Sequence, residues 1–108
     1  MKPTVAATLH LLPTEVSWRR SPIRNGYRPA FKFSSVEGHW VGSNFVMNPD
    51  PLAPGGEATI KFQLISMEEL APSLKVGTKF EIYEGWNLQG EGVITGFEDT
   101  PYVIPGDS

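Results

Sequence analysis

Residues 20–33 of the chain, RSPIRNGYRPAFKF, decide the fold. The second half of this stretch alternates in polarity, with aromatic residues on one face of an extended chain and basic residues on the other: Tyr27, Phe31 and Phe33, then Arg28 and Lys32. Alternation with a period of two predicts a half-buried strand. Pro29 falls on the apolar face and has no N–H to donate, so the strand starts there or runs along an edge.

Similar short runs recur along the chain. Residues 57–64, EATIKFQL, alternate cleanly, and four further runs predict strands: Val5–Leu12, His39–Val46, Lys79–Tyr83 and Gly92–Phe97. Glycine and proline, 11 and 10 residues respectively, separate these runs as turn residues. Residues 66–74, SMEELAPSL, predict one helical turn at most, because Pro72 interrupts them. Six short strands joined by turns predict a small antiparallel barrel or sandwich.

The size and composition of the chain predict one domain. Its 108 residues lie near the common domain size, and we expect residues 98–108 to form a loose C-terminal tail. The absence of cysteine excludes disulfides and thiolate metal sites. No apolar run approaches the roughly 20 residues of a membrane helix, and VAATLHLL near the start makes a poor signal peptide. We therefore expect a soluble cytoplasmic protein without membrane contact.

The residues that catalysis requires are missing or scattered. No stretch matches the phosphate-binding pattern G-x-x-x-x-G-K-[ST], which argues against a nucleotide site. His10 and His39 fall on separate predicted strands, and no motif places a general-base partner or a metal-ligand spacing beside either. Gly90, Gly92 and Gly96 indicate turns and close strand packing instead of a cofactor loop. We predict a protein that is not an enzyme and holds no cofactor or metal.

The basic residues are concentrated in one segment. Between Val16 and Val36 there are five basic residues and no acid, whereas the rest of the chain holds four basic and twelve acidic residues. Four of the five are arginines that lie within ten residues: Arg19, Arg20, Arg24 and Arg28. Without a counter-charge they repel one another until an anion arrives. They are therefore candidate binding residues, although a solvated strand face explains them about as well.

The same segment resembles a known family. Residues 19–33 are similar to the stretch that opens the third, C-terminal β-barrel of bacterial elongation factor Tu, which follows the pattern G-R-H-T-P-F-x-x-G-Y-R-P-Q-F. Residues 47–64 look like the V-M-P-G-D segment of that family, and residues 77–97 resemble G-x-R-F-A-I-R-E-G-G-R-T-V-G-A-G-V-V. The resemblance implies an all-β fold, a small six-stranded antiparallel β-barrel, present here as a stand-alone domain without the GTPase domain. In the family this domain grips aminoacyl-tRNA, contacts the GTPase domain and receives the exchange factor.

The chain departs from the family pattern on the surface that contacts tRNA. Ala30 replaces the glutamine of R-P-Q-F, and residues 85–90, GWNLQG, replace G-G-R-T-V-G. Basic and hydroxyl groups are lost there, and Trp86 and Leu88 arrive at a turn. Arg20 stands where the family has histidine, which preserves a cation for a phosphate.

Two functional hypotheses follow. In the first, the chain is a protein-interaction module anchored by Trp86 and Leu88, since tryptophan and arginine most often anchor interfaces. A competing interpretation folds Trp86 back onto its own barrel. In the second hypothesis, Arg19, Arg20, Arg24 and Arg28 within the basic segment 19–32 bind tRNA or another RNA. We prefer a protein partner, because the acidic remainder and the lost family contacts weaken RNA binding.

Overall fold

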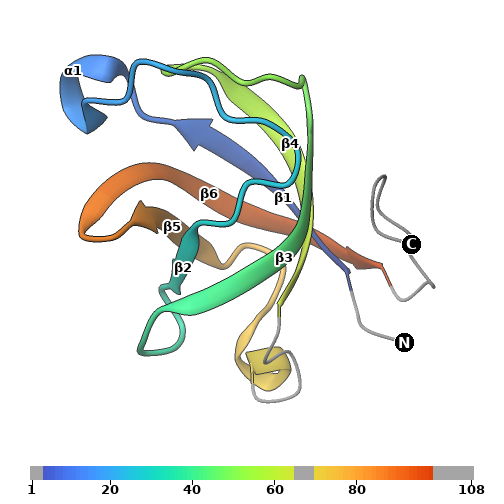
Figure 1. Cartoon of the computed structure of the whole chain (residues 1–108). Helices are drawn as coiled ribbons and strands as arrows, with labels where there is room; N and C mark the ends of the chain where they lie inside the picture. The colour runs from blue at the N-terminus through green and yellow to red at the C-terminus, as the bar shows by residue number, and fades with distance from the viewer. Residues whose placement is uncertain (1–3, 65–69, 99–108) are drawn as a thin grey trace.

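Six antiparallel strands close into a barrel in the computed structural model of the chain, which describes residues 4–64 and 70–98 (Figure 1). The strands are β1 (Thr4–Leu11), β2 (Ala30–Phe33), β3 (Trp40–Asn48), β4 (Glu57–Leu64), β5 (Lys79–Glu84) and β6 (Asn87–Glu98). Their order around the barrel is β1-β4-β3-β2-β5-β6, and β6 pairs back to β1. The predicted six-stranded antiparallel barrel is confirmed.

Most of the predicted strands match the observed ones closely. β4 has the predicted bounds, and β2 starts at Ala30, directly after Pro29, as the missing proline N–H requires. β6 starts at Asn87, five residues before the predicted Gly92. The helical turn expected within residues 66–74 is represented by the 3-10 turn η1 (Ala71–Ser73), and residues 65–69 lie outside the described part of the chain. The expected loose tail starts at Glu98, which is the last residue of β6, and its other residues, 99–108, also lie outside.

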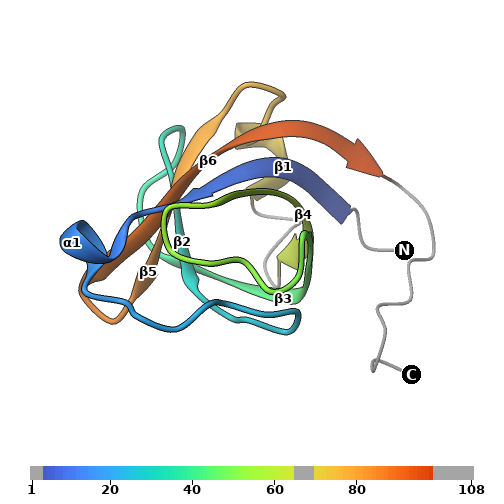
Figure 2. The ribbon, with the colours of Figure 1, turned by 90° about the horizontal axis from the view of Figure 1, so that it is seen from above.

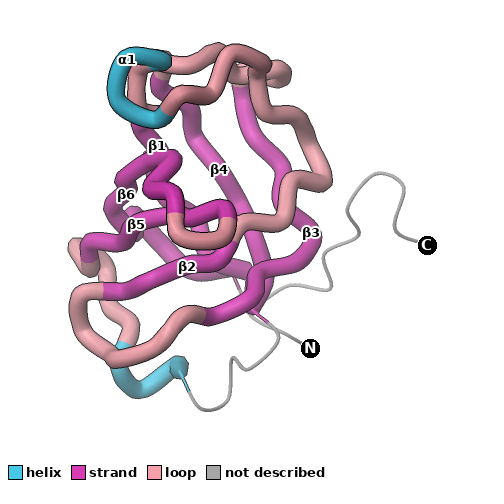
Figure 3. Tube along the Cα trace, turned by 60° about the vertical axis from the view of Figure 1, so that its left-hand side comes forward, coloured by secondary structure: helices cyan, strands magenta, loops and turns pink. Residues whose placement is uncertain are grey.

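One short helix, α1 (Thr14–Ser17), was not predicted. It follows β1, and the N–H groups of Val16 and Ser17 both donate to the carbonyl of Pro13. Four residues are too few for helical periodicity to show in a sequence. α1 and η1 lie at opposite ends of the barrel (Figures 1 and 3).

Phenylalanine rings fill the interior of the barrel. Phe31 on β2 lies at the centre: its ring stacks on that of Phe62 with 4.3 Å between centroids, and the centroids of Phe80 and Phe33 lie 5.6 and 5.9 Å away. All four side chains are fully or almost fully buried. Ring contacts of this kind contribute about 0.5–1.5 kcal/mol each beyond the burial of apolar area. The aromatic residues of segment 26–33 therefore serve the core, as their alternation predicts.

Two glycines make room for these rings. A Cβ atom on Gly42 would lie 2.6 Å from Cε1 of Phe31, and one on Gly92 would lie 2.3 Å from Cζ of Phe80 and 2.7 Å from the carbonyl oxygen of Thr8. All three distances are far shorter than van der Waals contact of a Cβ atom with carbon or oxygen allows. Gly96 differs, because nothing lies within 4 Å of its Cβ position. Close packing therefore accounts for Gly92 but not for Gly96, which corrects the expectation for the latter.

We expect Gly92→Ala to destabilise the barrel by about 2 kcal/mol, because the added methyl group overpacks the core against Phe80 and the β1 backbone. The matched control is Gly96→Ala on the same strand, for which we expect a change within about 0.5 kcal/mol. Urea unfolding of the two variants measures the difference. Equal destabilisation by both would contradict the packing described here.

Candidate functional site

Two tryptophan side chains project into solvent from segments on one side of the barrel. Trp18 follows α1 and is 82% exposed, and Trp86 lies in the turn between β5 and β6 and is 93% exposed. α1 and this hairpin turn lie on the same side of the molecule in two perpendicular views (Figures 1 and 2). Val16 on α1 is also exposed. We call Val16, Trp18 and Trp86 the tryptophan face.

A set of contacts around Arg19 joins α1 to the β5–β6 hairpin. The guanidinium group of Arg19 forms an ion pair with Glu84 at the end of β5, and its Nε donates to Oε1 of Gln89 on β6 at 2.8 Å. It also lies over the ring of Tyr27, 5.4 Å from the centroid, and the Tyr27 hydroxyl donates to Oε1 of Glu84 at 2.7 Å. These contacts hold the residue after Trp18 against the strands on either side of Trp86.

Burial of Tyr27 favours its neutral form. Desolvation raises the pKa of the phenol to about 12, although the nearby Arg19 cation lowers the pKa in the opposite direction. At neutral pH the hydroxyl is therefore protonated, as its donation to Glu84 requires. Glu84 thus receives both a cation and a hydroxyl donor, and its charge is largely compensated within the molecule.

Arg19 does not belong with the free arginines of the basic segment. Its side chain is only 14% exposed, and Glu84 supplies the counter-charge that was expected to be missing. Its other partner, Gln89, is 3% exposed. Arg20, Arg24 and Arg28 are exposed, and in the described residues none of the three has an ion-pair partner. Of the four candidate arginines, three therefore remain available to bind a partner.

The backbone of Trp18 is held in an unusual conformation. Its φ of 65° and ψ of 6° lie in the left-handed region, which bulky residues rarely adopt. Hydrogen bonds fix this conformation on both sides: the Trp18 N–H donates to the Thr14 carbonyl at 2.8 Å, and the Thr14 hydroxyl donates to the Arg19 carbonyl at 2.7 Å. Strained residues of this kind cost about 1–3 kcal/mol and cluster at functional sites.

Trp86 and Leu88 have different environments. Gly85, with φ 59°, fits the first position of a two-residue hairpin turn, so Trp86 lies at the tip. Its exposure excludes the interpretation in which it folds back onto the barrel. Leu88 lies within β6, opposite Tyr83, and is half-buried. The candidate site therefore gains Trp18, which no sequence pattern indicates, and Leu88 is less exposed than expected for a turn residue.

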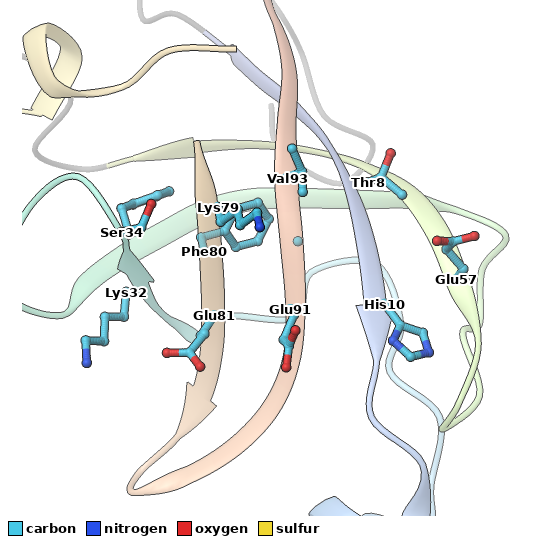
Figure 4. A pocket seen from close by; sticks show the side chains of 12 residues that line it. Thr8, His10, Lys32, Ser34, Glu57, Lys79, Phe80, Glu81, Glu91 and Val93 are labelled. Atoms are coloured by element: carbon cyan, nitrogen blue, oxygen red, sulfur yellow. The ribbon is translucent and has the colours of Figure 1, made fainter. Parts of the chain in front are cut away.

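A second surface feature is a shallow groove of about 460 Å³ on the outer wall of the barrel (Figure 4). Strand register places five ionisable side chains in one row across it: Lys32, Glu81, Glu91, His10 and Glu57. Glu81 and Glu91 are directly opposite each other, which is a destabilising arrangement of like charges. The groove is open, and half of its twelve lining residues carry ionisable side chains, so it does not enclose a ligand as the concave sites of small molecules do. We therefore place the candidate site at the tryptophan face.

No family model matches the chain. Among residues 4–64 and 70–98 there is no group of three histidine or carboxylate side chains placed to hold a metal ion. No helix in this part of the chain is long and apolar enough to cross a membrane.

The neighbouring arginines Arg19 and Arg20 should respond differently to truncation. Arg19→Ala leaves the buried side-chain oxygen Oε1 of Gln89 without its Arg19 donor and removes the ion pair with Glu84, so we expect a loss of about 2 kcal/mol in the free energy of unfolding. Arg20→Ala should change it by less than about 0.5 kcal/mol. Thermal and urea unfolding of both variants would test this, and a similar loss in both would show that Arg19 has no special structural role.

Proposed function

We propose that the chain is a non-catalytic protein-binding module and that the tryptophan face anchors its partner. The observation that carries the proposal is that two almost fully exposed indoles, Trp18 and Trp86, lie on segments that the contacts of Arg19 join. Exposed apolar patches mark interaction sites, and tryptophan dominates the binding energy of many interfaces.

The conformation of Trp18 supports the proposal. A left-handed backbone would be accommodated more easily by glycine or asparagine, yet the chain holds a tryptophan there and turns it outward. The hydrogen bonds of Thr14 and the contacts of Arg19 maintain this arrangement. A local conformation that lowers stability while exposing a large apolar side chain is consistent with use in binding.

We further propose that the chain is related to the third domain of elongation factor Tu. The closed six-stranded barrel and the resemblance of residues 19–33 support this proposal. The departures at residues 85–90 fall on the candidate site: Trp86 forms the exposed tip and Gln89 holds Arg19. In this proposal the barrel was kept, and a turn that contacts tRNA in the family became part of a protein-binding surface.

RNA binding is the second candidate. The observation that favours it is the exposure of three unpaired guanidinium groups, Arg20, Arg24 and Arg28, in the described part of the chain. Indoles can also stack on unpaired bases. Two features weigh against it: Arg19 is occupied by Glu84, and the chain has a net charge of −3.

Two variants test the proposed function, and a third serves as their control. The immobilised protein is incubated with extract of the source cell, and the captured proteins are compared for wild type, Trp86→Ala and Trp18→Gly. Loss of an anchoring indole should reduce capture at least about tenfold. Trp18→Gly should also keep or raise the thermal stability, because glycine adopts a positive φ without strain.

The control for this experiment is Val76→Ala, which also removes an exposed apolar side chain but lies in the turn before β5, at the other end of that strand from Trp86. It should capture the same proteins as wild type. Identical captured sets for all four proteins would refute the role of the tryptophan face. Capture that disappears after nuclease treatment would favour the RNA candidate.

A further inference from the structure

The charges around the tryptophan face identify the chemistry of the partner. We infer that the partner presents an acidic peptide segment, in which carboxylates flank an aromatic or aliphatic side chain. This inference rests on the proposed function, because it concerns the same surface.

Two exposed cations belong to the segments that meet at the β5–β6 hairpin. Arg20 directly follows Arg19, whose guanidinium group contacts the β5–β6 hairpin. Arg28 directly follows Tyr27, whose hydroxyl donates to Glu84, two residues before Trp86. Neither Arg20 nor Arg28 has an ion-pair partner within residues 4–64 and 70–98.

The acidic groups at this end do not neutralise these two cations. Glu84 is engaged by Arg19 and by the Tyr27 hydroxyl, so its charge is compensated within the molecule. Glu15 on α1 is an exposed carboxylate close to the face in sequence, and it offsets only one of the two guanidinium groups. The local balance is therefore positive in a chain of net charge −3, which favours an anionic partner at this end.

The arrangement suits carboxylates better than an RNA backbone. A guanidinium group binds a carboxylate through two parallel hydrogen bonds, and such pairs give both energy and orientation. An RNA strand requires a basic track for successive phosphates. Here the carboxylates of Glu81 and Glu91, paired on the same hairpin, would repel a strand that continued along it. A short acidic segment can pack an apolar side chain against the indoles and pair its carboxylates with Arg20 and Arg28 without that repulsion.

A displayed library of random 16-residue peptides tests the inference with a defined probe. We expect wild type to enrich peptides with a net negative charge and at least one aromatic or leucine residue. The double charge reversal Arg20→Glu/Arg28→Glu should weaken binding of an enriched peptide at least about tenfold at about 50 mM salt, and by less at about 500 mM, where screening is stronger. The matched control Lys75→Glu/Lys79→Glu changes the net charge equally away from the face and should keep the affinity.

Trp86→Ala separates failure of this inference from failure of the proposed function. Peptides that are enriched only when Trp86 is present, but that show no acidic preference or tolerate the arginine reversal, would overturn the acidic partner and leave the protein-binding proposal standing. If no peptide depends on Trp86, both fail. A random-sequence RNA of 20 nucleotides is measured in parallel, and RNA binding that is lost on arginine reversal, without peptide enrichment, would overturn both in favour of RNA.

Discussion

The packing around Phe31 is the constraint on which the rest of the structure depends. A small barrel must fill its interior with side chains, and here one phenyl ring at the centre, that of Phe31, contacts the rings of Phe62 on β4 and Phe80 on β5. Gly42 and Gly92 leave the space that this ring and Phe80 occupy. Because the apolar faces of β2 and β5 are committed to the core, only outward-facing side chains and the connecting loops are left to form a functional surface.

Arg19 joins two surface segments of this barrel. The long connection between β1 and β2 carries α1 and Trp18, and Arg19 attaches it to Glu84 and Gln89 on the hairpin that carries Trp86. α1 and the β5–β6 turn, which are far apart in the sequence, thereby lie on the same side of the molecule. Arg19 thus stabilises the fold although it belongs to a basic cluster. Its neighbour Arg20 has no ion-pair partner among the residues that the structure describes and is free to bind another molecule.

Much of the fold could be predicted from the sequence, because alternation and turn residues are local properties. Pro29 indicates the start of β2, and residues 57–64 alternate over the full length of β4. The early start of β6 could not be predicted, because residues 87–91 are mostly polar and take their strand conformation from pairing with β5 and β1. Neither could α1, which is one turn long.

The candidate site was less predictable, because it depends on contacts between distant residues. The composition of the turn at Gly85 indicated Trp86, whose position at a hairpin tip exposes it. Nothing in the sequence indicated Trp18, since its exposure follows from a left-handed backbone after an unpredicted helix. The pairing of Arg19 with Glu84 joins residues 65 positions apart and is set only by the barrel register. Burial of the Gln89 side chain in an otherwise polar turn has the same origin.

Binding of a partner at the tryptophan face requires contact with Trp18 and Trp86. The chain has three tryptophans, and the third, Trp40, is half-buried with its indole N–H donating to the Glu37 carbonyl at 3.2 Å. Nuclear magnetic resonance of the three indole N–H groups during titration with a peptide selected for binding is therefore the most direct test. We expect the Trp18 and Trp86 signals to shift together while that of Trp40 stays in place. A bound peptide that shifts only the Trp40 signal, or none of the three, would show that the partner does not bind at the tryptophan face.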